Sequence, residues 1–593
     1  MYDRWNEQLK EHPALAAGLL FLITFLVFQG TLANGFVYDD GKQVLENPFV
    51  RNPHLWSRIF TGPVWSFQGP GAQENFYRPL HIFSHWLVYR VAGANPYAYH
   101  LFQLVLYAST VLLVFRIGRE LLRNDLAAFF GAALWAMHPL HVEAVAWIAS
   151  VPDVGCGFFY LLAFWLFLRA EQAEGGQARR HLLAALAYFP ALFFKEMALS
   201  FPLLLLAYWL FVPARASRRE KVIHCLPYVA AVTGYVLIRI LVLGHFSGAS
   251  RIWSVSPRLV GAAGGLLGQH ARLFFWPVDL NVFHTFDLGP SLRSPWPWAA
   301  LLALGLACWY RRREAVFSFL VIWWAVTLLP CLDVRQLSFP LLAERFDYLP
   351  SVGLCLAISF LCLIKLPASL PVLRPQPVLL TAVILLMGLW AVQDFRTIPY
   401  WRNNDALWGY SLRVAPDAGL VHINHGLVLQ YREGDLEGAA REYETALRLN
   451  QASFQRLSNV TYDAYLGLGE IANLKGHREE AVAYFTRASR FSPYNSEAYD
   501  YLGSMYFPRQ EYAQASEYFQ RAVTENPYDL GARFYLGACL LKLGKPLQAA
   551  EQFRAARAVD PTYYQVYEAE AHALEAAGDL AGAARVRSLK PRN

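Results

Sequence analysis

The chain has 593 residues, of which 55% are hydrophobic, 15% aromatic and only 16% charged. Soluble proteins carry about 25% charged residues, so this composition excludes an ordinary soluble protein. The net charge is +7, yet residues 402–593 hold 21 basic and 23 acidic residues, so the positive excess lies entirely in residues 1–401. Such an excess is typical of membrane-protein loops and is a poor match for nucleic acid binding.

Apolar segments of roughly helix-spanning length predict a polytopic membrane protein. Eleven occur in the first two-thirds, near 13–33, 98–117, 126–137, 152–168, 182–194, 198–212, 223–243, 296–310, 315–332, 346–364 and 377–393. The first has no convincing small-residue cleavage site, so we expect an anchor and not a signal peptide. The seven cysteines show no paired spacing, which indicates neither a disulfide framework nor a zinc site.

The distribution of Lys and Arg predicts the orientation of these segments. With the N-terminus inside, the connections assigned to the cytoplasm carry fifteen basic residues and the short connections assigned outside carry three. This asymmetry follows the positive-inside rule. Because the number of spans is odd, residues 401–593 are expected outside, in the periplasm or an organelle lumen.

The last third repeats itself with a period of 34 residues. The period relates Gly469, Gly503 and Gly537, and equally Ala481, Ala515 and Ala549; Phe485, Phe519 and Phe553; Ala488, Ala522 and Ala556; and Pro493, Pro527 and Pro561. An earlier copy contains Tyr443 and a degenerate last copy contains Gly578. This pattern resembles tetratricopeptide repeats, about five of them. Their concave surface binds peptide segments in such arrays, and a rigid spacer without a ligand is the alternative.

Two adjacent acids, Asp39 and Asp40, follow the first apolar segment directly. Neighbouring carboxylates at a membrane surface repel each other, so one of them can have a raised pKa. A raised pKa suits a general base. The alternative is a pair of solvated loop acids.

The second outer connection contains His138, His141 and Glu143, with Asp153 ten residues further on. Two imidazoles and a carboxylate within six residues can hold a divalent cation or form a proton relay. Because the spacing is not a standard metal signature, it favours a hydrogen-bonded network over a metal.

Further charged residues are expected on the same side of the membrane. They are Arg78, Lys195, Glu196, Glu344 and Arg345. A basic group at the level of the lipid headgroups is a suitable partner for a phosphate. It is equally suitable as half of a structural ion pair.

Several of these motifs, taken in order, resemble the TMTC family. They are Tyr38-Asp39-Asp40, Tyr77-Arg78-Pro79-Leu80, the segment from His138 to Val145, Lys195-Glu196 and the segment from Glu344 to Gly353. TMTC proteins combine a transmembrane part with tetratricopeptide repeats. They are similar to GT-C glycosyltransferases and related to protein O-mannosyltransferases.

The resemblance implies an all-α chain with two domains. Residues 1–400 would form a GT-C-like transmembrane bundle of about eleven spans, and residues 401–593 the tetratricopeptide-repeat α-solenoid. It further implies that Asp39 and Asp40 are the catalytic pair, with a lipid-linked sugar phosphate as the donor. The array is shorter than is usual in higher organisms, which indicates a bacterial inner-membrane relative whose carrier is undecaprenyl and not dolichyl phosphate.

We therefore expect a membrane glycosyltransferase that moves a hexose, mannose foremost, from a polyprenyl or dolichyl phosphate to Ser or Thr of proteins by inverting displacement. His138, His141 and Glu143 would orient the catalytic acid or bind a cation. Arg78, Lys195 and Arg345, with Glu196 and Glu344 beside them, would form the donor phosphate site. The rivals are a non-catalytic scaffold for envelope assembly, a lipid-linked-sugar transporter, and an enzyme acting on a glycan or lipid acceptor.

Overall fold

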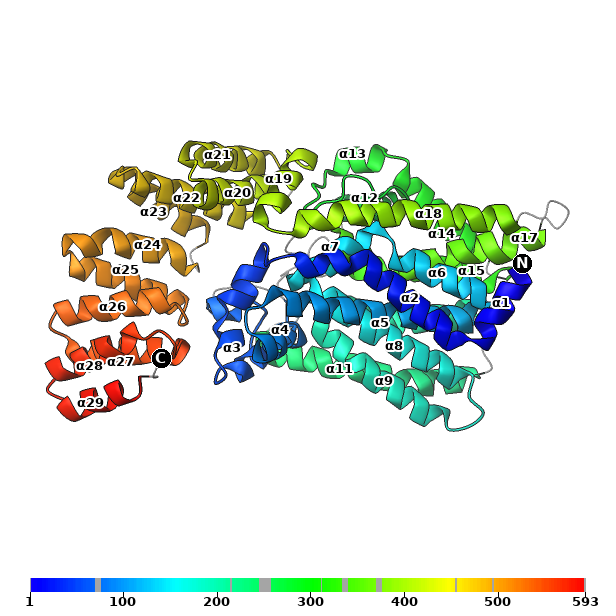
Figure 1. The fold of residues 1–593 in the computed structure, drawn as a ribbon, viewed down its shortest axis with the longest axis horizontal. Helices are drawn as coiled ribbons and strands as arrows, with labels where there is room; N and C mark the ends of the chain where they lie inside the picture. The colour runs from blue at the N-terminus through cyan, green and yellow to red at the C-terminus, as the bar shows by residue number, and fades with distance from the viewer. Residues whose placement is uncertain are drawn as a thin grey trace. The chain divides into compact units, whose positions relative to one another are not determined.

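The computed structural model describes residues 2–69, 76–213, 216–244, 257–310, 312–332, 340–369, 376–453, 456–492 and 495–590. Within these ranges the chain is helical and has no strand, which confirms the predicted fold class (Figure 1). The chain forms two compact units, Met1–Gly41 with Asn75–Ala415, and Lys42–Glu74 with Pro416–Asn593. The sequence predicted a single division, between residues 400 and 401. In the structure, residues 42–74 of the first outer loop also belong to the second unit.

Unit 1 is a bundle of helices joined by short 3₁₀ turns. Its helices are α1 (Tyr2–Glu11), α2 (Pro13–Phe28), α4 (Pro79–Ala92), α5 (Pro96–Leu122), α6 (Asp125–Ala136), α7 (Val142–Ala146), α8 (Val151–Glu171), α9 (Gln177–Phe194), α10 (Phe201–Phe211), α11 (Arg218–Leu243), α12 (Pro257–Phe275), α13 (Leu288–Arg293), α14 (Trp296–Tyr310), α15 (Ala315–Leu328), α16 (Ser351–Phe360), α17 (Leu366–Ser369), α18 (Gln376–Thr397) and α19 (Asn404–Val414).

Each of the eleven apolar segments coincides with one of these helices. In the described part of the chain, seven helical stretches are long and apolar enough to cross a membrane. Three shorter apolar helices, Asp125–Ala136, Glu196–Phe211 and Trp296–Tyr310, accompany them. The chain is therefore a multi-pass membrane protein.

Local sequence explains where several helices begin and end. Arg123 takes a left-handed conformation (φ +52°) at the end of α5, and the side chain of Asn124 then accepts a hydrogen bond from the Ala127 amide to cap α6. Ser217 and Glu220 form a reciprocal capping box at the start of α11. Such caps satisfy amides that have no partner within their own helix.

The core of unit 1 lies around α8, which packs against α5 and α9. Phe164 on α8 stacks on Phe319 and meets Trp323 edge-on, and Trp323 is fully buried. Helices α15 and α16 approach so closely that a Cβ at Gly353 would lie 2.3 Å from the Leu320 carbonyl oxygen. Only glycine allows this approach.

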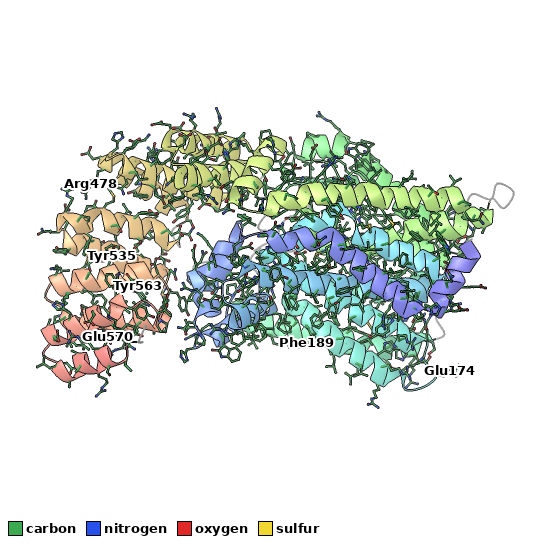
Figure 2. All side chains as sticks on the ribbon, in the orientation of Figure 1. Glu174, Phe189, Arg478, Tyr535, Tyr563 and Glu570 are labelled. Carbon is green, nitrogen blue, oxygen red and sulfur yellow. The ribbon has the colours of Figure 1, made fainter. Side chains whose placement is uncertain are left out.

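Unit 2 contains five antiparallel helix pairs. They are α20 (Gly419–Val428) with α21 (Leu436–Ala452), α22 (Ser458–Leu474) with α23 (Arg478–Phe491), α24 (Ser496–Tyr506) with α25 (Tyr512–Glu525), α26 (Leu530–Lys542) with α27 (Pro546–Val559), and α28 (Gln565–Ala576) with α29 (Leu580–Ser588). Figure 2 labels Tyr535 and Tyr563 among the aromatic side chains of this array.

The 34-residue period has a direct structural cause. In three successive pairs a glycine of the first helix faces the phenylalanine of the second, and a Cβ at Gly469, Gly503 or Gly537 would lie 2.6–2.8 Å from that ring. The aromatic ring thus packs into the notch that glycine leaves, which holds the two helices of a pair together. The predicted repeat is confirmed, except that Pro493 lies outside the described residues.

One segment of unit 2 comes from the first outer loop. It contains α3 (Pro48–Arg51) and packs on the repeats. The Asn52 side chain donates hydrogen bonds to the carbonyls of Ala558 and Val559, at 2.9 and 3.1 Å, and Phe49 meets Tyr528 edge-on. The sequence offered no periodic signal for this contact.

Candidate functional site

The predicted site residues of unit 1 lie on short turns at one end of its long helices. Asp39 and Asp40 follow α2, Glu143 lies on α7, and Lys195 and Glu196 lie between α9 and α10. Glu344 and Arg345 belong to a 3₁₀ turn, Glu344–Asp347, directly before α16. Non-helical turns leave side chains free to converge, which is where sites on helical scaffolds are usually built.

The two adjacent acids have different environments. Asp40 is fully buried, and its carboxylate accepts hydrogen bonds from the amides of Val37 (2.9 Å) and Ala149 (2.7 Å). Burial raises the pKa of Asp40 well above its usual range. Asp39 is only half-buried. Asp40 therefore fastens the loop, and Asp39 is the acid of the pair that a substrate can approach.

The residue before these acids has a strained backbone. Tyr38 has φ +51°, a left-handed conformation that is uncommon for a residue with a large side chain. Its amide donates to the Asn404 side chain, and its ring stacks on Trp147 and meets Trp408 edge-on. Strain held in place by several contacts is typical of functional sites.

Glu143 and Arg345 form a buried, two-point ion pair. One carboxylate oxygen of Glu143 accepts the Arg345 amide at 2.9 Å, and the other accepts the guanidinium. The guanidinium also lies over the rings of Trp147 and Phe346. Burial raises the pKa of Glu143 to about 7. The geometry therefore orients Arg345 through a carboxylate that changes charge near neutral pH.

Lys195 forms a second buried pair next to the same aromatic ring. Its ammonium lies 2.5 Å from a carboxylate oxygen of Asp153, and both side chains are almost inaccessible. The ammonium also lies 4.9 Å from the centre of the Phe346 ring. Phe346 therefore has both Lys195 and Arg345 against it.

A third group joins two arginines through one acid. Arg78 contacts Glu196 at 2.7 Å, and Arg239 contacts the other oxygen of Glu196 at 3.3 Å. Glu196 is itself an anion and so cannot attract a phosphate. It holds Arg78 and Arg239 in position.

Glu344 is also engaged by protein groups. It accepts the Asn281 amide at 2.5 Å and contacts His284 at 2.9 Å, and burial raises its pKa well above the usual range. These contacts give it the role of fixing the loop that carries Arg345.

The structure does not bring His138, His141 and Glu143 together as a metal-binding group. The Nε2 atom of His138 lies 3.1 Å from the Phe274 carbonyl oxygen, and its Nδ1 atom accepts the Leu140 amide at 3.3 Å. The two ring nitrogens of His141 lie 3.0 Å from the hydroxyl oxygens of Tyr107 and Ser351. In the described part of the chain, the one arrangement of at least three such ligand atoms within 4.8 Å is elsewhere in unit 1. Both histidines thus belong to a hydrogen-bonded network, the alternative that the sequence favoured over a metal site.

Sequence reasoning missed two neighbours of this site. Arg239 lies near the end of the apolar helix α11, and an arginine in such a helix was the signal that could have identified it. His81 lies one turn after Arg78, and both of its buried ring nitrogens lack a partner among the described residues. Burial, aided by the charges of His85, Arg78 and Lys195, lowers the pKa of His81 well below its usual range. It is therefore neutral.

Comparison with known proteins shows what the two parts of the chain are similar to. Residues 78–242, which contain Arg78, Glu143, Lys195 and Arg239, match the family described as dolichyl-phosphate-mannose-protein mannosyltransferase. Residues 428–496 and 502–562 match a tetratricopeptide repeat family. The chain is 26% identical to human Protein O-mannosyl-transferase TMTC1 over 518 residues, which cover 76% of this chain and 56% of that protein.

This chain is similar to TMTC-type protein O-mannosyl-transferases. Protein O-mannosyl-transferase F38B6.6 of Caenorhabditis elegans is 23% identical over 456 residues, covering 73% of this chain and 62% of its own length. The chain thus spans less than two thirds of these relatives. The chain also matches a solved structure, "YrrB: a TPR protein with an unusual peptide-binding site", at 24% identity and a TM-score of 0.25. The match covers 31% of this chain and 90% of the YrrB chain.

Proposed function

We propose that this chain is a membrane glycosyltransferase that moves a hexose, mannose foremost, from a polyprenyl-type phosphate to Ser or Thr of a protein. One observation carries the proposal. Lys195 and Arg345 lie against the same Phe346 ring, each oriented by a carboxylate, on the side of unit 1 that also carries the acid pair. Cations fixed in this way suit a phosphate leaving group.

The proposed reaction is a single displacement. Asp39 takes the proton from the acceptor hydroxyl while its oxygen attacks the anomeric carbon. The bond from that carbon to the phosphate oxygen breaks, and the lipid phosphate leaves with the electron pair. Arg345, Lys195 and Arg78 stabilise its charge, and the neutral His81 donates a hydrogen bond. Attack opposite the leaving group inverts the anomeric centre.

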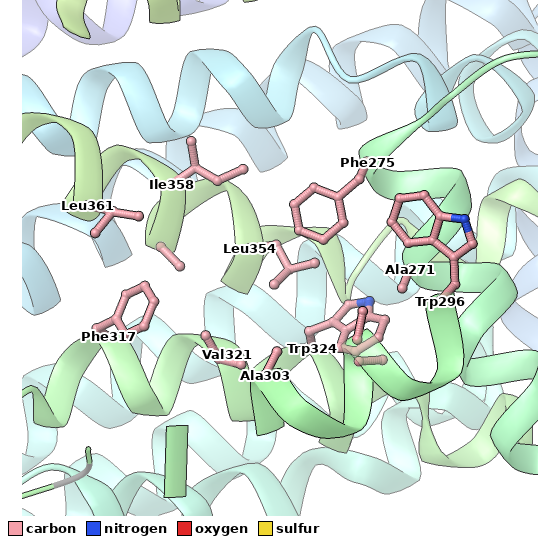
Figure 3. Close-up of a pocket in the computed structure, with 13 residues that line it drawn as sticks. Ala271, Phe275, Trp296, Ala303, Phe317, Val321, Trp324, Leu354, Ile358 and Leu361 are labelled. Carbon is pink, nitrogen blue, oxygen red and sulfur yellow. The ribbon is translucent and has the colours of Figure 1, made fainter. Parts of the chain in front are cut away.

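The lipid chain of the donor needs an apolar site within the bundle. Helices α12, α14, α15 and α16 line a partly open cavity of about 260 Å³ with apolar side chains, among them Phe275, Trp296 and Phe317 (Figure 3). Ala271 lines this cavity, and its neighbour His270 lies 2.7 Å from Asp347, two residues after Arg345. We propose that the cavity accepts the part of the polyprenyl chain nearest the phosphate.

The remaining assignments belong to the same proposal. The basic residues of the loops support a C-terminal unit on the periplasmic or lumenal side. The short repeat array supports a bacterial inner membrane. The repeats would present the protein acceptor. The phosphate charge is met by basic side chains, and we assign no cation to His138, His141 or Glu143.

A transfer assay tests the proposal. Purified full-length chain in detergent is given a polyprenyl-phosphate mannose and a Ser/Thr peptide, and mass spectrometry follows the addition of one hexose. We expect transfer by the natural chain and its loss in Asp39→Asn. Asp435→Asn, at a helix start in unit 2 where asparagine caps as well as aspartate, is the matched control. Equal activity of Asp39→Asn and the control would overturn Asp39 as the base, and absence of transfer by the natural chain would favour the scaffold.

A further inference from the structure

Three titratable side chains meet at the other end of α8, away from the candidate site. Glu171 is the last residue of α8, His181 lies in the second turn of α9, and His224 lies in the second turn of α11. All three are buried, with relative exposures of 8%, 0% and 5%. Asp153 and Glu171 are separated by about 27 Å along the helix. The proposed sugar transfer therefore does not use this cluster.

The three side chains point at one another at distances longer than those of strong hydrogen bonds. The Nε2 atom of His181 lies 3.3 Å, and the Nδ1 atom of His224 lies 3.4 Å, from the same Glu171 oxygen, Oε1. None of these three buried atoms has a hydrogen-bond partner in the described part of the chain. A charge-assisted hydrogen bond would be about 2.7–2.9 Å long. Three buried polar atoms that converge and remain unsatisfied require an explanation.

Their spacing matches the ligand shell of a tetrahedral metal ion. Zinc bonds imidazole nitrogen at about 2.0–2.1 Å and carboxylate oxygen at about 2.0–2.2 Å, so a tetrahedral angle separates two ligand atoms by about 3.4 Å. The two measured nitrogen-to-oxygen distances, 3.3 and 3.4 Å, equal that edge. All ligand atoms of the group lie within 4.8 Å of one another.

Two outer contacts already orient these ligands. The indole N–H of Trp209, on α10, donates to the second oxygen of Glu171 at 3.0 Å and leaves Oε1 for the metal. The Nδ1 atom of His181 lies 3.1 Å from the Tyr228 hydroxyl oxygen. With Nδ1–H donating to Tyr228, Nε2 carries the lone pair that a metal needs. Second contacts of this kind are a regular feature of protein metal sites.

We propose that Glu171, His181 and His224 bind a divalent transition-metal ion, with zinc the best match, which joins α8, α9 and α11. Two imidazoles and one carboxylate are a zinc ligand set, and a water molecule completes the tetrahedron. The ion neutralises the buried carboxylate and satisfies all three unpaired atoms. The ion would hold the ends of three helices together and leave one coordination position to water.

Metal content of the full-length protein tests the proposal directly. The purified chain is stripped with a chelator, given zinc, washed and analysed by elemental mass spectrometry. We expect one zinc per chain and a higher unfolding temperature than for the stripped protein. Glu171→Gln, which still accepts the Trp209 hydrogen bond, and His224→Asn should each lose the zinc.

A matched control comes from unit 2. His477 also lies 3.4 Å from a carboxylate, that of Glu480, but it is exposed and belongs to no three-ligand group among the described residues. His477→Gln should therefore keep one zinc per chain.

A milder variant covers the case in which the ligand variants do not fold. Tyr228→Phe keeps the ring and removes only the hydroxyl beside His181, so zinc affinity should fall about 10–100-fold. The proposal is overturned if the natural chain binds no stoichiometric zinc. It is equally overturned if folded Glu171→Gln and His224→Asn retain it, and the cluster is then a hydrogen-bonded network. None of these readouts depends on sugar transfer.

Discussion

The two ends of α8 carry carboxylates in opposite situations. At the first end Asp153 lies 2.5 Å from the Lys195 ammonium, and the nearby Glu143 is held by Arg345. At the second end Glu171 faces two histidines at 3.3 and 3.4 Å, and the facing atoms have no hydrogen bond in the described residues. The same bundle thus builds a set of closed ion pairs and an open cluster.

The difference teaches what each end can bind. Cations that are already oriented by acids can share their charge with a transient anion and return to the pair when it leaves. Three buried atoms that converge on one point can all be satisfied by one resident ion, and leaving them unsatisfied costs about 1–3 kcal/mol each. We therefore place a transient phosphate at the first end and a resident metal at the second.

The largest expected effect comes from Asp39→Asn. It removes the basic lone pair of a general base, so the rate of transfer should fall about 10²–10⁴-fold. The zinc content should not change, because the two sites lie about 27 Å apart along α8. Loss of both activity and zinc in this variant would contradict the separation of the two ends.

Asp40→Asn provides the contrast within the acid pair. The side-chain NH₂ group of asparagine replaces one of the two oxygens that accept from the backbone N–H groups of Val37 and Ala149. One of these N–H groups then has no acceptor, so the variant should lose about 1–3 kcal/mol of unfolding free energy. Thermal unfolding in detergent measures this loss. If Asp40→Asn folds normally but loses transfer as strongly as Asp39→Asn, then Asp40 is the base.

The second prediction separates ion pairing from phosphate binding at Lys195. Lys195→Met leaves the buried Asp153 charge without its partner and should destabilise the protein by about 3–5 kcal/mol. The double variant Lys195→Met with Asp153→Asn should recover most of that stability. It should not recover the KM for the donor, which we expect to rise because a phosphate contact is gone. Recovery of both would make Lys195 a structural residue only.

Regular parts of this molecule could be predicted from the sequence because their signals are local. Apolar runs located eleven of the helices of unit 1, and the recurring glycine and phenylalanine positions located the repeats. The contact of the first outer loop with the repeats could not be predicted, because Asn52 and Ala558 are 506 residues apart and neither belongs to a periodic pattern.

The site was predictable in residue type but not in pairing. Asp39, Lys195 and Arg345 were identified as polar residues where the membrane makes them costly, and their roles stay predictions. Which acid meets which base depends on tertiary packing, so Asp153 was not connected to Lys195. The cluster at the second end had a weaker signal, because Glu171 and His181 flank one short connection and His224 lies in the second turn of α11, beyond α10.

The third prediction is a pH dependence that belongs to the first end alone. Burial raises the pKa of Glu143 to about 7. Below that pH the carboxyl is neutral and leaves the Arg345 charge to the donor phosphate, whereas above it the carboxylate competes for the guanidinium. The donor KM should therefore rise as pH increases through 7, and a competition of about 1 kcal/mol corresponds to about a fivefold rise.

Glu143→Gln is the control for this dependence. Glutamine resembles the protonated acid in shape and charge, so the variant should keep a low donor KM across the same pH range. Initial rates at several donor concentrations between about pH 5.5 and pH 8.5 would show the difference. This range extends to both sides of the Glu143 pKa of about 7. A KM in Glu143→Gln that follows that of the natural chain would assign the titration to another group.

The smallest expected effect comes from the same Lys→Met change in unit 2. Lys42 pairs with Glu497 at 3.1 Å, but both side chains are 45% exposed, unlike Lys195 and Asp153. Water already solvates these charges, so Lys42→Met should cost less than about 1 kcal/mol of unfolding free energy, and the cost should shrink further at high salt. Thermal unfolding of Lys42→Met and Lys195→Met at low and high salt compares them directly. If Lys42→Met and Lys195→Met lose equal amounts of unfolding free energy, burial is not the reason that the ion pair at the first end of α8 stabilises the protein.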